Sequence, residues 1–428
     1  MNKKFKDVII VGFALFAIFF GAGNLIFPPY LGVLSGSEYK KAMFGFLLTD
    51  PVLPILGVIV TAKLGGGADD LGKRVGSTFS KILGTVTILT IGPLFAIPRT
   101  AATTHEVFVS KVFQGAPHWI TAIIFFTLTA IFVFNESGVI DKIGKYLTPG
   151  LVIILLAIII KCIINPIGDM KPPETEGVFL KGFAEGYQTM DALGAALMTG
   201  IVVSDLIRKG YHDEAERYKQ VKKVGFVAFI LLAIIYGGLI YVGSTASKLY
   251  TTDNTRVDIL LGTVQNVLGP AGKIAIGIAV SLACLTTSVG LSAVAGNFFS
   301  EITNEKLGYK LVVIITVIAS GLSSLAGVEG LIKAAVPILS IVYPIIIVLI
   351  LLGLIDEHIK YDMTYKGAVL ATFIISLMET LYNTFHILEK PVKTIKLLPF
   401  GSVGFEWIIP AAITAIIFGA IARVRDKK

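Results

Sequence analysis

The chain has 428 residues, of which 54% are hydrophobic and only 15% are charged, and its formal net charge is +8. A soluble domain usually carries about 25% charged residues, so this composition argues against a water-soluble protein. Two cysteines are too few for a disulfide framework or a cysteine-based metal site.

Apolar runs of about 20 residues recur along the chain, and each can cross a hydrocarbon core about 30 Å thick. The runs are continuous rather than alternating, which favours membrane helices over a β-barrel. We therefore predict an all-α integral membrane protein of about twelve transmembrane helices. The predicted spans are roughly 8–30, 42–64, 80–108, 118–137, 147–165, 182–204, 221–243, 272–299, 310–327, 331–355, 367–386 and 404–422.

The distribution of lysine and arginine predicts the orientation. Most of these residues fall in the N-terminal segment, in the even-numbered inter-span segments, which include the basic stretch 205–223, and in the tail 423–428. By the positive-inside rule the N-terminus is cytoplasmic, and an even number of spans places the C-terminus there too. The net positive charge is thereby explained, and no nucleic-acid partner is expected.

The first span carries a local break signal. Gly21 and Gly23 weaken the helix at membrane depth, and Asn24 puts a polar side chain where it is costly without a partner. Pro28 and Pro29 follow directly. These features favour an unwound segment, and close helix packing through small residues is the alternative.

The sixth span has a related break over Gly186–Gly194, in which Asp191 follows Tyr187, Gln188, Thr189 and Met190. Interrupted helices at corresponding positions in two halves point to a transporter site; a structural role for Asp191 as a cap or ion pair is the alternative. We expect one transmembrane domain over 1–428. It comprises a first repeat at 8–165, an inverted second repeat at 182–355 and two additional helices at 367–422.

The eighth span offers three oxygen ligands. Thr286 and Thr287 follow Ala283 by three and four residues, so their hydroxyls lie on the same helix face as the Ala283 carbonyl. Such a set suits a hard monovalent cation. Alternatively, each hydroxyl only bonds a carbonyl of its own helix.

Three segments together resemble a known family. GAGNLIFPP at 21–29, GPLFAIPRTAATTHEV at 92–107 and GYQTMDALG at 186–194 resemble the bacterial branched-chain amino acid carriers called the LIVCS family. The resemblance implies the LeuT-type fold of the amino acid–polyamine–cation superfamily, with a 5+5 inverted repeat and broken helices 1 and 6. It also implies symport of leucine, isoleucine and valine with Na⁺ across the bacterial plasma membrane, by alternating access. The sodium site it implies combines carbonyls of Ala17 and Phe20 with Ala283, Thr286 and Thr287.

The zwitterionic substrate defines the expected binding roles. The exposed N–H groups of a half-helix suit the carboxylate, which assigns that role to Gly21, Ala22, Gly23 and Asn24. The ammonium is expected at carbonyls around Tyr187, Gln188 and Thr189, with Asp191 as a helper. Phe20, Leu25, Met190 and Leu193 are the expected apolar pocket. One methylene is worth only about 1–3 kcal/mol, so the three substrates should compete.

Other readings stay open at this point. Proton coupling through Asp191 or Asp50 is the main alternative, and a channel is another. A membrane-embedded enzyme is disfavoured because neither H-E-x-x-H nor G-x-S-x-G occurs. No organic cofactor and no obligatory protein partner is expected, and the lipid bilayer is the surrounding medium.

Several further polar residues fall in or near the apolar spans. Arg99 either lines the pathway or pairs with an acid such as Asp50. His105 and Glu106 are expected at the outer end of the third span, in contact with water. Glu379 lies outside the repeats, which favours a structural or interfacial role.

Overall fold

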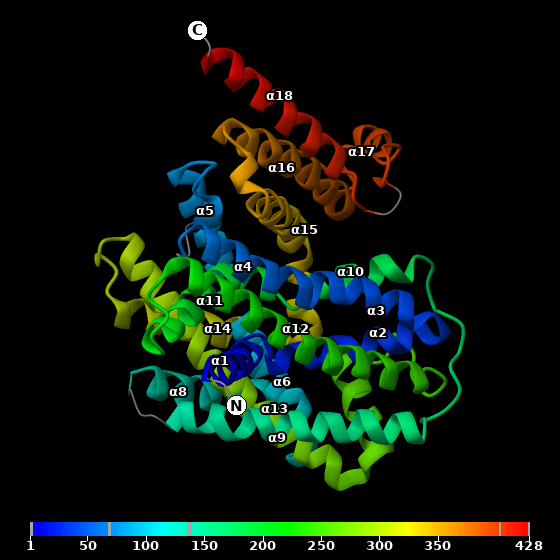
Figure 1. The fold of residues 1–428 in the computed structure, drawn as a ribbon. Helices are drawn as coiled ribbons and strands as arrows, with labels where there is room; N and C mark the ends of the chain where they lie inside the picture. The colour runs from blue at the N-terminus through cyan, green and yellow to red at the C-terminus, as the bar shows by residue number, and fades with distance from the viewer. Residues whose placement is uncertain (1–2, 67–69, 135–138, 402–403, 427–428) are drawn as a thin grey trace. The chain divides into compact units, whose positions relative to one another are not determined.

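The computed structural model describes residues 3–66, 70–134, 139–401 and 404–426, with the side chains of Ala22 and of residues 139–148 left out. Within these ranges all regular secondary structure is helical (Figure 1). The chain divides into two compact units. Unit 1 contains residues 1–51, 88–190 and 226–334, and unit 2 contains residues 52–87, 191–225 and 335–428.

All twelve predicted segments are helical over most of their described length. Among the described residues, five short helices lie outside the predicted spans: η2, η4, α7, η7 and α17. The helices, including 3-10 and π segments labelled η, are α1 (Lys3–Phe19), η1 (Ala22–Ile26), α2 (Phe27–Ser35), η2 (Gly36–Glu38), α3 (Tyr39–Leu47), η3 (Leu48–Val52), α4 (Leu53–Leu64), η4 (Asp70–Gly72), α5 (Ser77–Leu89), η5 (Thr90–Leu94), α6 (Ala96–Thr104), η6 (His105–Val109), α7 (Ser110–Val112), α8 (His118–Phe134), α9 (Val139–Ile164), α10 (Val178–Tyr187), α11 (Asp191–Arg208), α12 (Glu214–Thr245), α13 (Arg256–Ile302), α14 (Tyr309–Ser324), α15 (Gly327–Leu354), η7 (Asp356–His358), α16 (Asp362–Phe385), α17 (Glu389–Ile395) and α18 (Ile408–Asp426).

Length and hydropathy identify membrane spans among the described residues. Seven helices are long and apolar enough to cross a membrane, or eight if α10 and α11 together form one broken span. Three shorter apolar helices, His118–Phe134, Pro149–Ile164 and Tyr309–Ser324, accompany them. The last residues of the predicted fourth span, 135–137, lie outside the described ranges. The prediction of an all-helical multi-pass membrane protein is confirmed.

The segment 244–271 differs from the prediction. It was expected to be a loop, but α13 begins inside it at Arg256. The Thr255 hydroxyl accepts a hydrogen bond from the Asp258 N–H at 3.1 Å, which caps the new helix. Gly269 then adopts a φ of 75° before Pro270 and interrupts the helix. The predicted eighth span is therefore the second part of α13.

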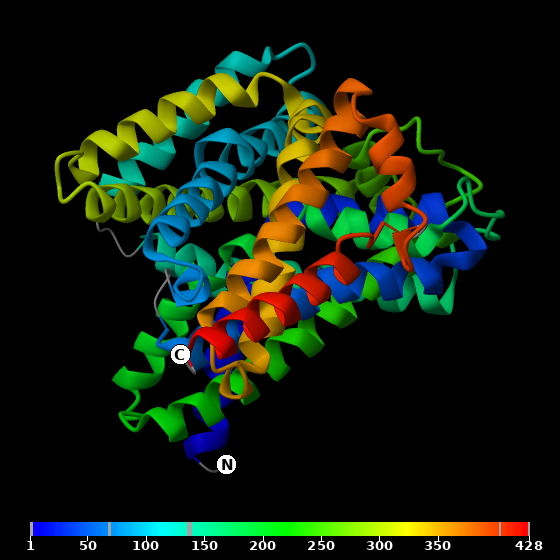
Figure 2. The ribbon, with the colours of Figure 1, turned by 90° about the horizontal axis from the view of Figure 1, so that it is seen from above.

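Unit 1 is organised around α13. This helix packs against α6, α8, α9 and α14 and against η1 (Figures 1 and 2). A buried hydrogen bond of 3.1 Å between the Thr129 and Ser288 hydroxyls joins α8 to α13. Elsewhere in the unit, α2 meets the end of α12 so closely that a Cβ added at Gly243 would lie 2.1 Å from the Pro29 carbonyl oxygen. The glycine is required there by the approach of two backbones.

Unit 2 contains the two additional helices, α16 and α18, which pack side by side and are drawn orange and red in Figure 1. The Thr414 hydroxyl of α18 donates to the Gly367 carbonyl of α16 at 2.9 Å. Glu379 of α16 lies 3.8 Å from the ammonium of Lys396 and beside the buried carboxyl of Glu406. Glu379 thus takes part in a local polar cluster, in line with the structural role expected for it.

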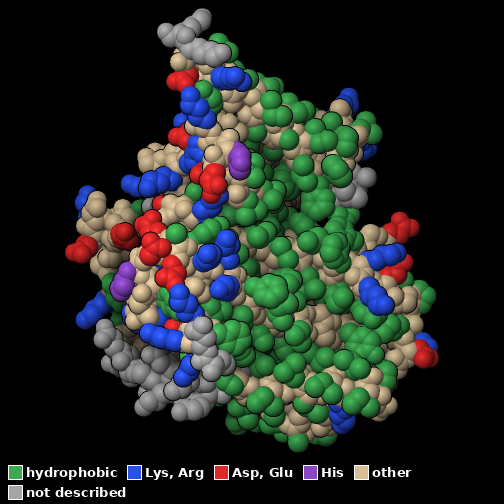
Figure 3. Space-filling model, in the orientation of Figure 1, with side chains coloured by type: hydrophobic (Ala, Val, Ile, Leu, Met, Phe, Trp, Pro, Cys, Tyr) green, Lys and Arg blue, Asp and Glu red, His purple; other side chains and the backbone are tan. Residues whose placement is uncertain are grey.

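Apolar side chains are abundant on the surface. Figure 3 shows them covering much of the visible face, with charged side chains gathered in separate patches. Ile164, Leu322 and Ile416 are 78%, 68% and 72% exposed. Isolated exposed apolar residues are ordinary, but a continuous cover of them indicates contact with lipid.

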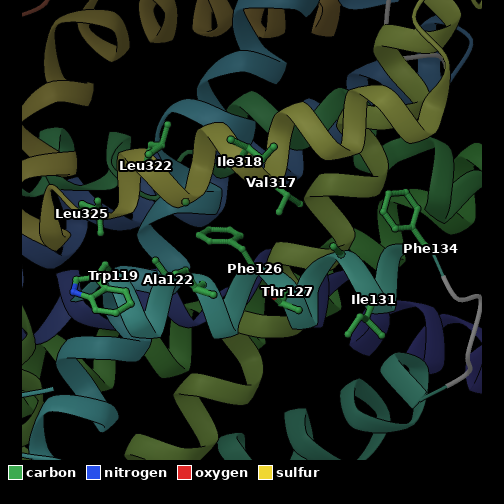
Figure 4. Close-up of a pocket in the computed structure, with 13 residues that line it drawn as sticks. Trp119, Ala122, Phe126, Thr127, Ile131, Phe134, Val317, Ile318, Leu322 and Leu325 are labelled. Atoms are coloured by element: carbon green, nitrogen blue, oxygen red, sulfur yellow. The ribbon is translucent and has the colours of Figure 1, made fainter. Parts of the chain in front are cut away.

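A groove of about 690 Å³ lies between α8 and α14 in unit 1 (Figure 4). Trp119, Phe126 and Ile131 of α8 face Ile318 and Leu322 of α14 across it. Its lining is almost entirely apolar. A zwitterion would lose its hydration there without gaining hydrogen-bond partners, so the groove is a poor candidate for the amino acid site.

Candidate functional site

The first predicted break is present. The helix α1 ends at Phe19, Gly21 has an extended backbone (φ −73°, ψ 139°), and the 3-10 segment η1 follows. In a continuous α-helix the Gly21 N–H would bond to Ala17, whereas here it bonds to the Phe19 carbonyl at 2.7 Å. The interruption therefore exposes main-chain groups inside a buried segment.

Asn24 has a defined part in this break. Its amide Nδ2 donates to the Phe19 carbonyl at 3.2 Å, and its N–H donates to Gly21 at 2.9 Å. The side chain is only 3% exposed. A polar residue at this depth is thus compensated by capping the carbonyl end of α1.

The second predicted break is present as well. The helix α10 ends at Tyr187, and Met190 has a left-handed φ of 66° before α11 begins at Asp191. The Thr189 hydroxyl donates to the Gly186 carbonyl at 2.7 Å. Gly186 itself packs against α3, because a Cβ added there would lie 2.0 Å from the Thr49 hydroxyl oxygen.

Arg99 reaches both interruptions, which both lie in unit 1. Its Nη1 donates to the Gln188 carbonyl at 2.6 Å. A Cβ added at Gly23 would lie 3.2 Å from its Nε, and its Cζ lies 5.1 Å from the centre of the Phe27 ring. The side chain is 3% exposed. The two roles that the sequence left open for Arg99, lining the pathway and pairing with an acid such as Asp50, both stay predictions.

The predicted sodium ligands on α13 lie next to the first break. A Cβ added at Gly21 would lie 4.0 Å from the Thr287 hydroxyl oxygen. Both the Thr286 and Thr287 hydroxyls donate to the Ala283 carbonyl, at 2.9 and 3.0 Å. These bonds are the ones expected of helical threonines without an ion. They still leave the lone pairs of both hydroxyls free to act as ligands.

The remaining predicted site residues are distributed between the units. In unit 1, Phe20 is 4% exposed and stacks on Phe16 with ring centres 4.7 Å apart, while Leu25 and Met190 are buried. Ala17 is half-buried in α1. Ala22 is described by its backbone only. Asp191 and Leu193 open α11 in unit 2. These assignments stay predictions.

One feature of the second break, the buried side-chain oxygen of Gln188, was not predicted from the sequence. The Gln188 side chain is 7% exposed, and its Oε1 has no hydrogen-bond partner among the described residues. A buried acceptor without a donor is costly. The sequence shows a polar stretch at this point, but the prediction assigned the ammonium to main-chain carbonyls and gave the Gln188 side chain no role of its own.

His105 is buried, although the sequence predicted that it would contact water. Its ring is 5% exposed, its Nδ1 lies 2.8 Å from the Thr121 hydroxyl, and its ring centre lies 3.7 Å from that of His118. The prediction of a solvated His105 is therefore wrong. Glu106 accepts a hydrogen bond from the Val328 N–H at 2.9 Å, at the start of α15.

Solved structures of low sequence identity share the fold. The inward-facing structure of Mhp1 superposes with a TM-score of 0.62 at 10% identity, covering 96% of this chain and 91% of that one. The crystal structure of MhsT in complex with L-phenylalanine gives a TM-score of 0.54 at 15% identity, covering 98% and 97%. Together with the two interrupted helices, these similarities show that this membrane protein has the LeuT-type fold.

Sequence relatives give the family. Residues 4–425 match the family described as branched-chain amino acid transport protein. The branched-chain amino acid permease BraB of Bacillus subtilis is 37% identical over 96% of this chain and 94% of its own length. A putative branched-chain amino acid carrier of Staphylococcus aureus is 35% identical over 99% and 98%. The chain belongs to this family of branched-chain amino acid transport proteins, and it is a transporter rather than an enzyme.

Proposed function

We propose that this chain imports leucine, isoleucine and valine across the bacterial plasma membrane by Na⁺ symport with alternating access, with both termini in the cytoplasm. The observation that carries the proposal is the pair of helix interruptions in unit 1, at Phe20–Gly21 and at Gln188–Met190. Arg99 bonds to the Gln188 carbonyl in the second and lies close to Gly23, two residues after the first. Family membership supports the substrate class.

The interruptions suit a zwitterion because they replace the water that it sheds. Transferring a charged group into an apolar medium without partners costs far more than a folded protein can spare. Main-chain N–H and C=O groups released by the breaks supply such partners at membrane depth. The predicted inverted repeats, 8–165 and 182–355, would let one half move against the other around this point.

The coupling ion is proposed to bind between α1 and α13. The Thr287 hydroxyl lies next to Gly21, and the Ala283 carbonyl lies within hydrogen-bonding distance of both threonine hydroxyls. Carbonyls of Ala17 and Phe20 would complete an all-oxygen set. An ion in this place would tie the first break to α13 and favour the arrangement that receives the substrate. Moving one positive charge inward at 100 mV releases about 2.3 kcal/mol.

Radiolabelled leucine uptake into proteoliposomes tests the proposal. Uptake by the parent protein should rise with an inward Na⁺ gradient at fixed pH and should be inhibited by unlabelled isoleucine and valine. The double variant Thr286→Ala with Thr287→Ala should lose the stimulation by Na⁺.

Thr263→Ala is the matched control, because the Thr263 hydroxyl makes the same kind of bond, to the Leu260 carbonyl at 2.8 Å, in the first part of α13. It should keep the parental stimulation. Unchanged Na⁺ dependence in the double variant would contradict the proposed ion site. Uptake that follows a proton gradient and ignores Na⁺ would replace sodium coupling by proton coupling.

A further inference from the structure

Arg99 carries a charged side chain that lies close to both helix interruptions. The guanidinium is placed by the first helical turn of α6, where the Arg99 N–H bonds to the Phe95 carbonyl at 3.0 Å. From there one side chain touches the carbonyl of Gln188 in the second break and lies against Gly23 in the first. An arginine is charged at any accessible pH, so a full positive charge sits between the two interruptions.

Gly23 accommodates this approach. A side chain at position 23 would begin 3.2 Å from Nε and 3.6 Å from Nη2 of Arg99, which is tighter than ordinary van der Waals contact. The absence of a Cβ thus lets the edge of the guanidinium face the first break. The Cζ of Arg99 lies over the Phe27 ring, 5.1 Å from its centre, a distance at which a cation and an aromatic ring attract each other.

A planar guanidinium fork matches a carboxylate with two parallel N–H···O bonds. The Gln188 side chain offers the complementary function, because its Oε1 is a buried acceptor with no donor within the described chain. An ammonium group carries three N–H donors and no acceptor. The two side chains therefore present a carboxylate partner and an ammonium partner, and the guanidinium is held beside Gln188 by its hydrogen bond to the main-chain carbonyl of that residue.

We infer that Arg99 and Gln188 recognise the two charged ends of the amino acid: Arg99 binds the α-carboxylate, and Gln188 Oε1 accepts a hydrogen bond from the α-ammonium. This inference rests on the proposed function and deepens it. It moves carboxylate recognition from main-chain N–H groups alone to a fixed side-chain charge. It also makes both groups necessary, so that amines and carboxylic acids with the leucine side chain are poor ligands.

The test compares ligands that lack one end. Purified protein in detergent is titrated with leucine, with leucinamide, which lacks the carboxylate, and with 4-methylpentanoate, which lacks the ammonium. The parent should prefer leucine to either analogue by about 100-fold, the scale of one hydrogen bond to a charged group. Arg99→Gln should weaken leucine binding about 100-fold and reduce the preference for leucine over leucinamide to a few-fold.

Gln188→Met is the second variant, since methionine has a similar length and no amide oxygen. It should reduce the preference for leucine over 4-methylpentanoate and keep the preference over leucinamide. This crossed pattern separates recognition from a merely structural bond, because loss of a structural bond would weaken all three ligands alike. Arg99→Lys keeps the charge without the fork, and should retain a preference over leucinamide at reduced affinity.

The possible results separate a failure of the proposed function from a failure of the roles assigned to Arg99 and Gln188. If the parent binds none of the three ligands, the proposed function fails. If the parent prefers leucine and Arg99→Gln keeps the full preference over leucinamide, only the assignment of Arg99 is overturned. If Arg99→Gln does not fold, Arg99→Lys and Gln188→Met carry the test, and uniform weakening of all ligands in both overturns the inference.

Discussion

Two buried arginines of unit 1 approach the same aromatic ring and have different partners. The Cζ atoms of Arg99 and Arg256 lie 5.1 and 5.8 Å from the centre of the Phe27 ring. Arg256 contacts two carboxylates, Glu185 at 2.7 Å and Glu329 at 2.5 Å. Arg99 contacts the carbonyl of Gln188 in a broken helix.

The difference separates two uses of a buried positive charge. The contacts of Arg256 join the starts of α13 and α15 to α10, so its charge is consumed in holding three helices together. The carbonyl that Arg99 contacts belongs to the segment where a substrate is expected. We therefore expect Arg256 variants to lose stability and Arg99 variants to lose ligand binding.

The largest expected effect is on Arg256→Gln. This change leaves Glu185 and Glu329 in a site where their side chains are only 16% and 31% exposed. Removing one partner of such a cluster typically costs about 3–5 kcal/mol. Thermal unfolding in detergent should show a large fall in the midpoint.

Lys111→Gln serves as the comparison for Arg256→Gln. Lys111 pairs with Asp258 at 3.0 Å, but the two side chains are 39% and 48% exposed, and exposed pairs contribute about 1 kcal/mol or less. A fall in midpoint as small as that of the control would mean that Arg256 does not anchor the helices. The comparison between the two arginines would then be lost.

A smaller effect is expected for Gly23→Ala. The added Cβ would lie 3.2 Å from Arg99 Nε, so the guanidinium must shift by a few tenths of an ångström. We expect leucine affinity to fall about 10-fold, because charged hydrogen bonds depend steeply on geometry. The unfolding midpoint should change little.

Gly150→Ala is the control for Gly23→Ala, since a Cβ at Gly150 meets nothing within 4 Å. It should leave the affinity for leucine unchanged. If Gly23→Ala binds leucine like the parent, the exact position of Arg99 does not matter for recognition.

The sequence predicted what is encoded locally. Glycines, prolines and a buried asparagine mark the first break, and the polar stretch after Gly186 marks the second, because these residues destabilise a helix wherever it packs. The helix beginning at Arg256 was also encoded locally, by the cap at Thr255, but it was not predicted. Contacts between distant segments were out of reach. Arg99 and Gln188 are 89 positions apart, and nothing in either segment specifies the other.

The partners of buried polar residues could not be predicted from the sequence for the same reason. His105 was assigned to water by its position near a helix end, whereas α8 supplies Thr121 and His118 as its neighbours. The sodium ligands on α13 were read from a spacing of three and four residues. That spacing also produces the bonds to Ala283 that the structure contains. Spacing alone therefore does not separate an ion site from ordinary helical threonines.

The smallest expected effect extends the comparison to a third arginine, Arg74 of unit 2, which lies between predicted spans. It contacts Asp356 at 2.5 Å and Asp362 at 2.7 Å, and its side chain is 21% exposed. Partial burial acts to raise the pKa of Asp356, but hydrogen bonds from Tyr365 and Arg74 outweigh it and hold that pKa below the ordinary value of 3.8.

The sign of the pH dependence follows from this lowered pKa. The unfolded chain binds the proton of Asp356 more readily than the folded chain, so the stabilisation is complete at neutral pH. It is lost as the pH falls below 3.8 through the lower pKa of the folded state. Asp356→Asn should therefore lower the unfolding midpoint at pH 7 by an amount equivalent to about 1 kcal/mol, and the difference from the parent should shrink in acid.

Asp253→Asn, at an exposed position, should produce no comparable loss at pH 7. If the unfolding midpoints of Asp356→Asn and its parent differ by the same amount from neutral pH to acid, the carboxylate charge is not what stabilises this end of unit 2. Arg74 would then act through its contact with the Tyr365 ring, 4.7 Å from its Cζ, and through its bond to the Ile359 carbonyl. Solvent-exposed charges are screened by salt. Raising the ionic strength should therefore reduce the loss of unfolding midpoint in Asp356→Asn more than the loss in Arg256→Gln.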